Sequence, residues 1–512
     1  MQAGSDRAVL QVDSPDPGGH ALGLNPQQAA AVLLDHASAG PALVLAGAGS
    51  GKTTVLARRI ARQTLLDGGG EGILALTFTK EAAEEMESRV EGLLEKAKSW
   101  GARLPTFGTF HAFAFALLRI EVSGIPNWRR LGFSRCPILL DPSAQSAWLA
   151  KAKEELGIDL PADALASMVA RPFEEASPDD PALAARPASR LPDLGHGETA
   201  VELRRRFRNH LLESGSLAFD DMVALAIRLL RDHPDALAEV TSRIRRVLVD
   251  EFQDTSPDQL ELVRLILGGR SSLFLVGDDD QAIYGFRGAD PANIDRALEL
   301  FPGMGILKLE TNYRSTPPIV AYANAVFGNK PGRLRKTLRA GRALPDGMRP
   351  DPVKVLVHAS GPEQGSWMIA EMGRLIREKG MAWKDMAILY RINALEPYYR
   401  SLVKTLAGPE AAAQISFATV HASKGLQYPA VFLVGLEDGV LPYRRKGETA
   451  DPARLAEERR IFYVGVTRAE RFLYLCACRR RMLRGRLREQ QVSPFLGRSP
   501  LSFLGFNGKV SS

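Results

Sequence analysis

Short apolar runs, each followed at once by polar residues, recur along this chain, and amphipathic stretches separate them. In the first half these runs cover residues 43–45, 73–76, 247–249 and 273–276. Strands that are buried on both faces read as continuous apolar runs, and crossover helices join parallel strands. The pattern therefore predicts a parallel sheet whose strand-following loops build one site.

The pattern changes between residues 115 and about 216, where helical periodicity is broken by a stretch rich in Pro, Ala and Asp at residues 171–194. We interpret this region as a mainly helical subdomain with a surface loop, inserted into the first domain. From about residue 306 the alternation returns, with strand candidates at residues 353–357, 386–390, 431–434 and 472–476. The expected organisation is a first α/β domain (1–114 and 217–305), the helical insertion (115–216) and a second α/β domain (306–512).

Composition sets the bounds on function. With 512 residues, 45% of them hydrophobic and 24% charged, the chain is of the globular class and long enough for two to four domains. The net charge of +7 favours a polyanionic partner without naming it, and a solvated basic surface is the alternative. Three cysteines exclude a disulfide framework and a four-thiolate metal site. The first twenty residues lack the apolar segment of a signal peptide and no run of about 18 apolar residues occurs, so we expect a cytoplasmic protein without membrane partners.

A glycine-rich loop follows the first apolar run and opens a helical stretch, with the sequence Ala46-Gly47-Ala48-Gly49-Ser50-Gly51-Lys52-Thr53. The backbone N–H groups of such a loop converge on phosphates at the positive end of a helix. Lys52 adds a point charge, and the hydroxyl of Thr53 suits Mg²⁺. Because Ala46 replaces the first glycine of the G-x-x-x-x-G-K-[ST] pattern, a chance glycine-rich turn is the alternative. The loop predicts a site for a nucleoside triphosphate.

Acidic residues follow a second buried strand, where residues 246–249 lead into Asp250-Glu251. The carboxyl ends of parallel strands meet at one edge of the sheet, so these carboxylates face the same crevice as the Lys52 loop. There Asp250 can hold Mg²⁺ and Glu251 can polarise the attacking water. A solvated acidic loop is the alternative for such a pair.

A glutamine and two aromatic residues follow the next strand. Gln281 is placed to contact a γ-phosphate or its attacking water, and Tyr284, Phe286 and Arg287 come directly after it. Aromatic rings beside an arginine suit stacking on single-stranded nucleic acid. The alternative is that Tyr284 and Phe286 are core residues.

Two segments of the second domain complete the expected nucleotide site. Residues 312–316, with Arg314, and residues 457–469, with Arg459, Arg460 and Arg468, each offer an arginine that can reach across a cleft to phosphoryl charge, although a single arginine is more often part of a surface ion pair. Together with the phosphate loop far upstream, they suggest that ATP lies between two sheets and that hydrolysis opens and closes the cleft.

These motifs, in this order over nearly the whole chain, resemble those of UvrD/Rep/PcrA-type superfamily 1 DNA helicases, whose phosphate loop itself begins with Ala. Residues 24–28 resemble the family's glutamine motif, residues 250–255 its metal and base motif, and residues 277–289 its sensor motif. The resemblance implies two RecA-like parallel-sheet domains, with a helical insertion in the first, that use ATP and Mg²⁺. The expected partners are single-stranded DNA and 3′-tailed duplex. The resemblance also implies that the protein moves in the 3′→5′ direction.

The resemblance also implies roles for individual residues. Lys52, Glu251, Gln281, Arg314 and Arg468 would be catalytic, with Glu251 as base, Gln281 as γ-phosphate sensor and Arg314 as arginine finger. Thr53 and Asp250 would hold the metal, Gln28 would read adenine, and Tyr313 would stack on it. The nucleotide-binding set is Gln28, Ala48, Gly49, Ser50, Gly51, Lys52, Thr53, Thr54, Tyr313, Arg314, Gln427 and Arg468. The DNA-binding set is Phe78, Thr79, His111, Tyr284, Phe286, Arg287, Arg391, Asn393, Thr419 and His421.

The chain departs from the family pattern at several positions. Thr54 stands where relatives often carry Arg, and Gln427 where they often carry Glu, which suggests looser nucleotide discrimination. Phe286 replaces a Trp. Where full-length relatives insert a large helical domain that restrains unwinding, this chain has only residues 393–417. We therefore expect an autonomous translocase and helicase without that domain. An accessory ATPase of a larger nuclease or defence complex and a non-motor DNA-binding switch are the alternatives.

Overall fold

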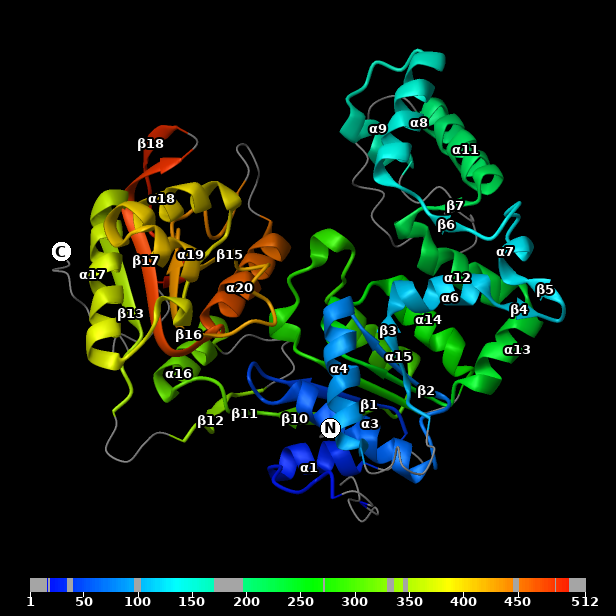
Figure 1. Cartoon of the computed structure of the whole chain (residues 1–512), viewed down its shortest axis with the longest axis horizontal. Coiled ribbons are helices and arrows are strands. Elements are labelled where there is room, and N and C mark those ends of the chain that lie inside the picture. Colours follow the sequence, from blue (N-terminus) through cyan, green and yellow to red (C-terminus); the bar gives the residue numbers. More distant parts are fainter. Residues whose placement is uncertain are drawn as a thin grey trace, which may run out of the picture.

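The computed structural model describes residues 16, 19–34, 40–95, 103–169, 197–269, 272–328, 336–343, 349–444, 451–483 and 485–496. Two parallel sheets dominate it, and a group of helices projects from one of them (Figure 1). This confirms the predicted α/β class. The surface loop expected at residues 171–194 lies outside the described residues.

The first sheet has six strands in the order β10-β1-β9-β8-β2-β3, and all its pairs are parallel. Its strands are β1 (Ala42–Ala46), β2 (Ile73–Thr77), β3 (Thr106–Thr109), β8 (Arg246–Val249), β9 (Leu273–Gly277) and β10 (Gly305–Leu309). The four strands expected from apolar runs in this half are confirmed. The predicted domain boundary after residue 305 is wrong, because β10 pairs with β1 and extends the first sheet to Leu309.

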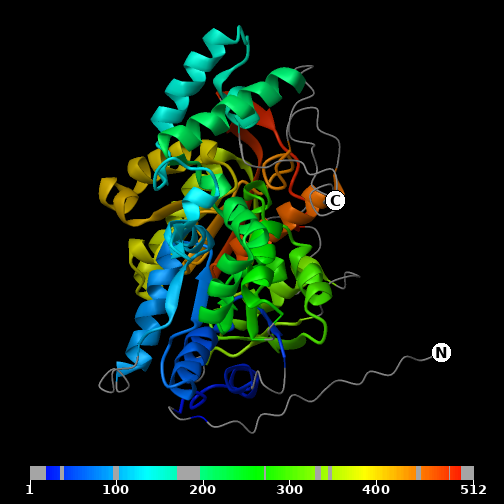
Figure 2. The ribbon, with the colours of Figure 1, turned by 90° about the vertical axis from the view of Figure 1, so that its right-hand side faces the viewer.

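Helices cover both faces of this sheet. One face packs on α1 (Pro26–Leu33), α3 (Lys52–Leu66) and α4 (Lys80–Leu93), and the other on α6 (Phe110–Arg119), α12 (Met222–Asp232) and α14 (Pro257–Leu267). Figure 2 shows the blue helices and the green helices on opposite sides of the strands. Burial on both faces explains why these strands read as continuous apolar runs.

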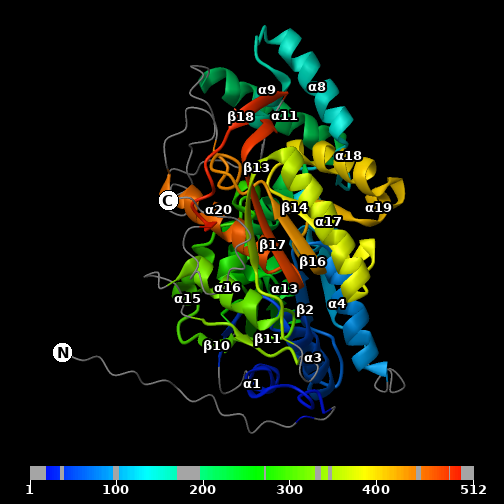
Figure 3. The ribbon, with the colours of Figure 1, turned by 90° about the vertical axis from the view of Figure 1, so that its left-hand side faces the viewer.

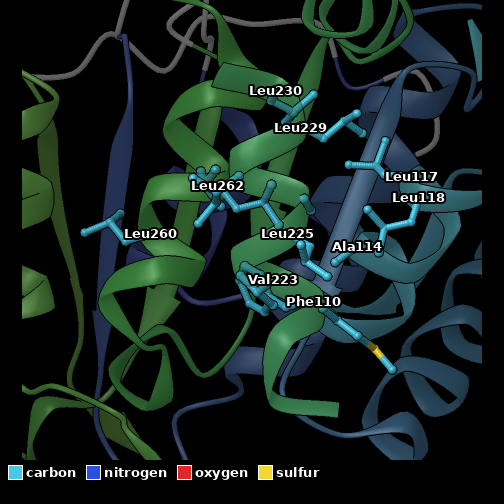
Figure 4. Packing of buried hydrophobic residues seen from close by; sticks show 14 of the residues in the cluster. Phe110, Ala114, Leu117, Leu118, Val223, Leu225, Leu229, Leu230, Leu260 and Leu262 are labelled. Atoms are coloured by element: carbon cyan, nitrogen blue, oxygen red, sulfur yellow. The ribbon is translucent and has the colours of Figure 1, made fainter. Parts of the chain in front are cut away.

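Helix α6 corrects the boundary predicted at residue 115. Its apolar positions, Phe110, Ala114, Leu117 and Leu118, recur at helical spacing and pack against Leu225 and its neighbours on α12 (Figure 4). Since this stripe continues to the last turn, α6 stays with the first domain up to Arg119.

The insertion is mainly helical, as predicted. Its helices α8 (Pro142–Glu155), α9 (Ala162–Val169) and α11 (Gly197–Ser214) stand apart from the sheet at the upper right of Figure 1. Short elements connect them to the first domain: β4 (Glu121–Val122), β5 (Ile125–Pro126), α7 (Asn127–Arg130), β6 (Ile138–Leu139) and β7 (Ser216–Leu217).

The second sheet has the order β13-β17-β16-β14-β15, and only β18 pairs antiparallel, with β17. Its strands are β13 (Lys354–Ser360), β14 (Met386–Tyr390), β15 (Ser416–Thr419), β16 (Tyr428–Val434), β17 (Ala469–Leu483) and β18 (Arg486–Glu489). Helix α17 (Gly361–Lys379) covers one face, while α16 (Pro317–Phe327) and α20 (Pro452–Val466) cover the other (Figure 3). All four strands predicted here are confirmed.

Between Asn393 and Phe417 the chain forms two helices, α18 (Glu396–Ala407) and α19 (Pro409–Gln414), and then enters β15. Buried Tyr399, Val403 and Ala411 pack these helices on the second sheet. In the described part of the chain, no helix is both long enough and apolar enough to span a bilayer.

Candidate functional site

The glycine-rich loop joins the carboxyl end of β1 to the first turn of α3. Gly49 and Gly51 have φ values of 65° and 82°, in the left-handed region that favours glycine. A Cβ at Gly49 would lie 2.7 Å from Cβ of Arg314, and one at Gly51 would lie 2.8 Å from Nε2 of Gln28. No side chain caps the first turn of α3. The loop therefore needs glycine at these points, and the positive end of α3 is open to an anion.

Gln28 lies directly against this loop. Its Nε2 donates to the carbonyl of Ser50 at 2.9 Å, and its Oε1 accepts from the backbone N–H of Asn25 in a capping box of α1. The side chain is 6% exposed. The predicted adenine-reading residue thus also fixes the phosphate loop to α1.

Lys52 meets the acidic pair that follows β8. Its Nζ lies 3.1 Å from Oε2 of Glu251. Burial opposes its charge, but Glu251, Asp278 and Asp250 outweigh that effect and raise the pKa of Lys52. The structure therefore places the predicted cation, base and metal ligand together, as expected for carboxyl-end loops of one parallel sheet.

Glu251 has a left-handed backbone, with φ of 48°. Such a conformation is uncommon for a residue with a side chain and clusters at functional sites. Burial disfavours its charge, yet Lys52 and Lys424 prevail and lower the pKa of Glu251 to about 2. Burial and the charge of Glu251 raise the pKa of the adjacent Asp250 to about 7. The lysines thus favour the charged form of Glu251, while burial and its neighbour disfavour that of Asp250.

Gln281 is buried between the two domains. Its Nε2 donates to Oδ2 of Asp278, and its Oε1 accepts from Nη2 of Arg468 at 3.3 Å. Its backbone carbonyl accepts from Nζ of Lys424 at 2.9 Å. The sensor candidate therefore touches an arginine and a lysine of the second domain.

Arg314 and Arg468 converge on the same place. Nη1 of Arg314 donates to the carbonyl of Thr467 at 3.0 Å, one residue before Arg468. Burial and the like charge of Arg314 lower the pKa of Arg468 to about 9. Among the described residues, Nε of Arg314 is buried without a hydrogen-bond partner. A buried and a half-buried cation that repel one another fit a polyanionic ligand.

Tyr313, the predicted adenine platform, lies against the phosphate loop and α1. Its backbone N–H donates to the carbonyl of Gly49 at 2.9 Å, and its hydroxyl accepts from Nδ2 of Asn25 at 2.7 Å. The side chain is 44% exposed, so part of the ring is open for stacking. Thr54 lies half-buried in the first turn of α3, and Gln427 is exposed before β16.

The predicted DNA-stacking residues form an aromatic cluster across the domain junction. Phe78, after β2, stacks on Tyr284 with centroids 4.9 Å apart and an interplanar angle of 16°. Phe286 lies edge-on to His421 at 5.5 Å. The guanidinium of Arg287 lies 5.4 Å from the centroid of Tyr284.

The members of this cluster differ in exposure. Tyr284 is half-buried and packs against the core of the second domain, whereas Phe286 is 54% exposed. Of the two alternatives for these rings, Tyr284 thus has mainly core contacts and Phe286 offers the open face. Burial, with the charges of Arg391, Lys424 and Arg287, lowers the pKa of His421 to about 4.

The predicted DNA residues Arg391, Thr79 and Thr419 lie at strand ends and have protein partners of their own. Arg391 makes a two-pronged ion pair with Glu458, with Nη2 to Oε1 at 2.7 Å. Thr79 caps α4, and Thr419 accepts a hydrogen bond from the backbone N–H of Ala422. Asn393 is exposed at the start of the turn before α18.

His111 stacks on a residue that the sequence analysis did not single out. The centroids of His111 and Phe219 are 4.1 Å apart, and Phe219 is 52% exposed. The sequence offered one signal for Phe219, an aromatic residue that directly precedes two acidic ones, Asp220 and Asp221. Lys424, which pairs with Asp254 and contacts Gln281, was also missed, although it lies three residues after His421 of the predicted DNA-binding set.

Two family models match the chain. The UvrD/REP helicase N-terminal domain matches residues 24–302, and the UvrD-like helicase C-terminal domain matches residues 400–480. Among individual proteins, a probable DNA helicase of Mycoplasma pneumoniae is 31% identical over 88% of this chain and 83% of its own length.

Two further relatives are similar over a smaller part of their own sequence. The ATP-dependent DNA helicase PcrA of Leuconostoc citreum is 34% identical over 73% of this chain and 47% of its own length. The ATP-dependent DNA helicase UvrD1 of Mycobacterium bovis is 34% identical over 74% of this chain and 48% of its own length. The alignments thus span most of the Mycoplasma protein but about half of the length of these two.

Proposed function

We propose that this chain, which belongs to the UvrD/REP helicase family, is an ATP-hydrolysing DNA helicase that moves 3′→5′ along single-stranded DNA. One observation carries the proposal. Gln281, which contacts Arg468 of the second domain, lies on the same short loop as Phe286, the exposed ring of the aromatic cluster. Nucleotide and DNA would therefore act on one loop at the domain junction.

The phosphate site supports ATP as the ligand. Lys52, Arg314 and Arg468 come from both domains, and Glu251 acts on the pKa of all three. Such cations lower the barrier to phosphoryl transfer by neutralising charge that develops in the transition state. Glu251, whose charged form Lys52 and Lys424 favour, would orient the attacking water and accept its proton.

The metal expected with ATP also has suitable ligands. Thr53 follows Lys52 in α3, and the carboxyl of Asp250 lies beside Glu251. A hydroxyl and a carboxylate are the oxygen donors that Mg²⁺ prefers, and the ion would neutralise phosphate charge there.

The aromatic cluster supports single-stranded DNA as the track. Stacking on Phe286 would tolerate every base, and Arg287 beside it would attract phosphates. Closure of the domains on ATP would press the second-domain residue His421 against this surface, and hydrolysis would release it. Repetition of that cycle moves a strand past the junction.

Stopped-flow translocation on end-labelled oligo-dT of increasing length tests the proposal. A lag that grows with length for one end label only, together with ATP hydrolysis stimulated by poly-dT, is the expected result. No DNA-stimulated hydrolysis would refute the motor. Strand separation on a 3′-tailed duplex, measured with a protein trap, then separates a helicase from a translocase that needs a second protein.

A further inference from the structure

Lys336 is a buried cation that the proposed mechanism does not use. Its side chain has no solvent exposure, and its ammonium contacts the carboxylates of Asp278 and Asp279, with Oδ2 of Asp280 at 3.3 Å. These three carboxylates have the spacing of a cation site. Here the ammonium of Lys336 is the cation among them, and they raise its pKa well above the ordinary value despite burial.

Asp278 contacts both Lys336 and Gln281. Its Oδ1 accepts from Lys336, and its Oδ2 accepts from Nε2 of Gln281. The other end of the Gln281 amide faces Nη2 of Arg468. The carboxylate of Asp278 thus selects which end of the amide turns to the arginine, because only the NH₂ group can donate to it.

Asp278 is also linked to the proposed base, Glu251, through the side chain of Gln253. Its backbone N–H donates to Oε1 of Gln253 at 2.7 Å, and Nε2 of Gln253 donates to Oε2 of Glu251 at 2.5 Å. A shift of Asp278 would therefore disturb Gln281 and Glu251 together.

The segment that carries Lys336 is anchored to other parts of the nucleotide site. Leu338 exchanges two hydrogen bonds with the side chain of Asn324 on α16, at 2.9 and 3.0 Å. Arg339 begins β12 (Arg339–Ala340), which pairs in parallel with β11 (Thr311–Asn312). A Cβ on Gly47 would lie 2.0 Å from Cδ2 of Leu338, so the segment also lies against the phosphate loop. Lys336 is consequently held at a defined place relative to both domains.

We propose that Lys336 is a positioning residue for ATP hydrolysis, which acts through Asp278 to orient the Gln281 amide toward the γ-phosphate. The inference rests on the proposed function. Without the ammonium, three neighbouring carboxylates repel one another, and Asp278 loses the partner that keeps it beside Gln281. ATP binding, which depends on the phosphate loop, is then retained while the transition state is stabilised less.

The test is a double-mutant cycle between Lys336→Met and Gln281→Ala, read as DNA-stimulated ATP hydrolysis. We expect Lys336→Met to lower kcat about 10- to 100-fold, with KM for ATP changed less than about 3-fold. In the Gln281→Ala background the same change should lower kcat less than about 3-fold further. Lys379→Met, which breaks an exposed ion pair with Asp351, is the matched control and should leave kcat unchanged.

The outcomes separate the inference from its premise. A wild-type chain without DNA-stimulated hydrolysis overturns the proposed function, whereas an active wild type with a normal Lys336→Met variant overturns the inference alone. A full additional loss in the Gln281→Ala background also overturns it, because Lys336 would then act elsewhere. If Lys336→Met does not fold, the near-isosteric Asp278→Asn replaces it in the cycle and must show the same coupling to Gln281.

Discussion

Two rings of the aromatic cluster, Phe286 and Tyr284, make a matched pair for testing how the protein would hold DNA. Phe286→Ala removes a side chain that is 54% exposed, whereas Tyr284→Ala removes one that is stacked on Phe78 and packed on the second-domain core. We expect the first change to weaken DNA binding and the second to lower stability.

The magnitude follows from stacking and burial. A base stacked on an aromatic ring contributes about 1 to 3 kcal/mol, so Phe286→Ala should raise the Kd for oligo-dT about 5- to 150-fold. Since an uncharged phenyl ring cannot neutralise a phosphate, the dependence of log Kd on log salt should keep its slope. Tyr284→Ala leaves a cavity beside Phe78 and should cost about 3 kcal/mol or more of unfolding free energy.

Fluorescence anisotropy of labelled dT oligomers over a salt series measures the first effect, and urea denaturation measures the second. Leu66→Ala, which shortens an exposed apolar side chain at the far end of α3, controls for loss of surface area. An unchanged Kd for Phe286→Ala would refute the stacking role. A loss of affinity confined to Tyr284→Ala, without a loss of stability, would reverse the assignment of the two rings.

Four further substitutions probe the site. Glu251→Gln should retain Mg-ATP binding, measured with a fluorescent analogue, and lower DNA-stimulated kcat about 10²- to 10⁴-fold. Lys52→Ala should lose ATP binding as well. Near-normal turnover in Glu251→Gln would exclude Glu251 as base. Arg314→Ala should lower kcat with little change in KM, and an effect on KM alone would remove its role in the transition state. Because the pKa of His421 is lowered from 6.5 to about 4 in the folded chain, the unfolded chain binds its proton first as pH falls. The free energy of unfolding should therefore fall between pH 6.5 and 4, and less steeply in His421→Gln, as urea denaturation at several pH values can check.

The sequence predicted the strands and loops of the nucleotide site because that information is local. A buried parallel strand is a continuous apolar run, and the residues that follow it at the carboxyl edge meet by topology alone. Topology alone therefore predicted that Lys52, Asp250 and Glu251 lie together. Strand β10 was misplaced because an apolar run carries no signal for which of two sheets it joins, and helix α6 because its apolar stripe does not show which helices it packs on.

Contacts between distant segments were not predictable in the same way. Arg391 pairs with Glu458, and Lys336 lies among three aspartates more than fifty residues earlier in the chain. Nothing in the local sequence distinguishes these side chains from solvated ones. Their partners are determined by how the second domain folds and by how it packs on the first, which no periodicity encodes.

The short loop after β9 carries both Gln281 and Phe286, and this has a thermodynamic consequence. If single-stranded DNA shifts the affinity for a nucleotide by some factor through that loop, the nucleotide must shift the affinity for DNA by the same factor, since the two bindings form a closed cycle. Reciprocity of this kind can be measured at equilibrium with a non-hydrolysable nucleotide, without any turnover. A strong mutual factor would mean that the loop has two discrete conformations, each favoured by one combination of ligands. The free-energy difference between these conformations would then drive the movement of the proposed motor.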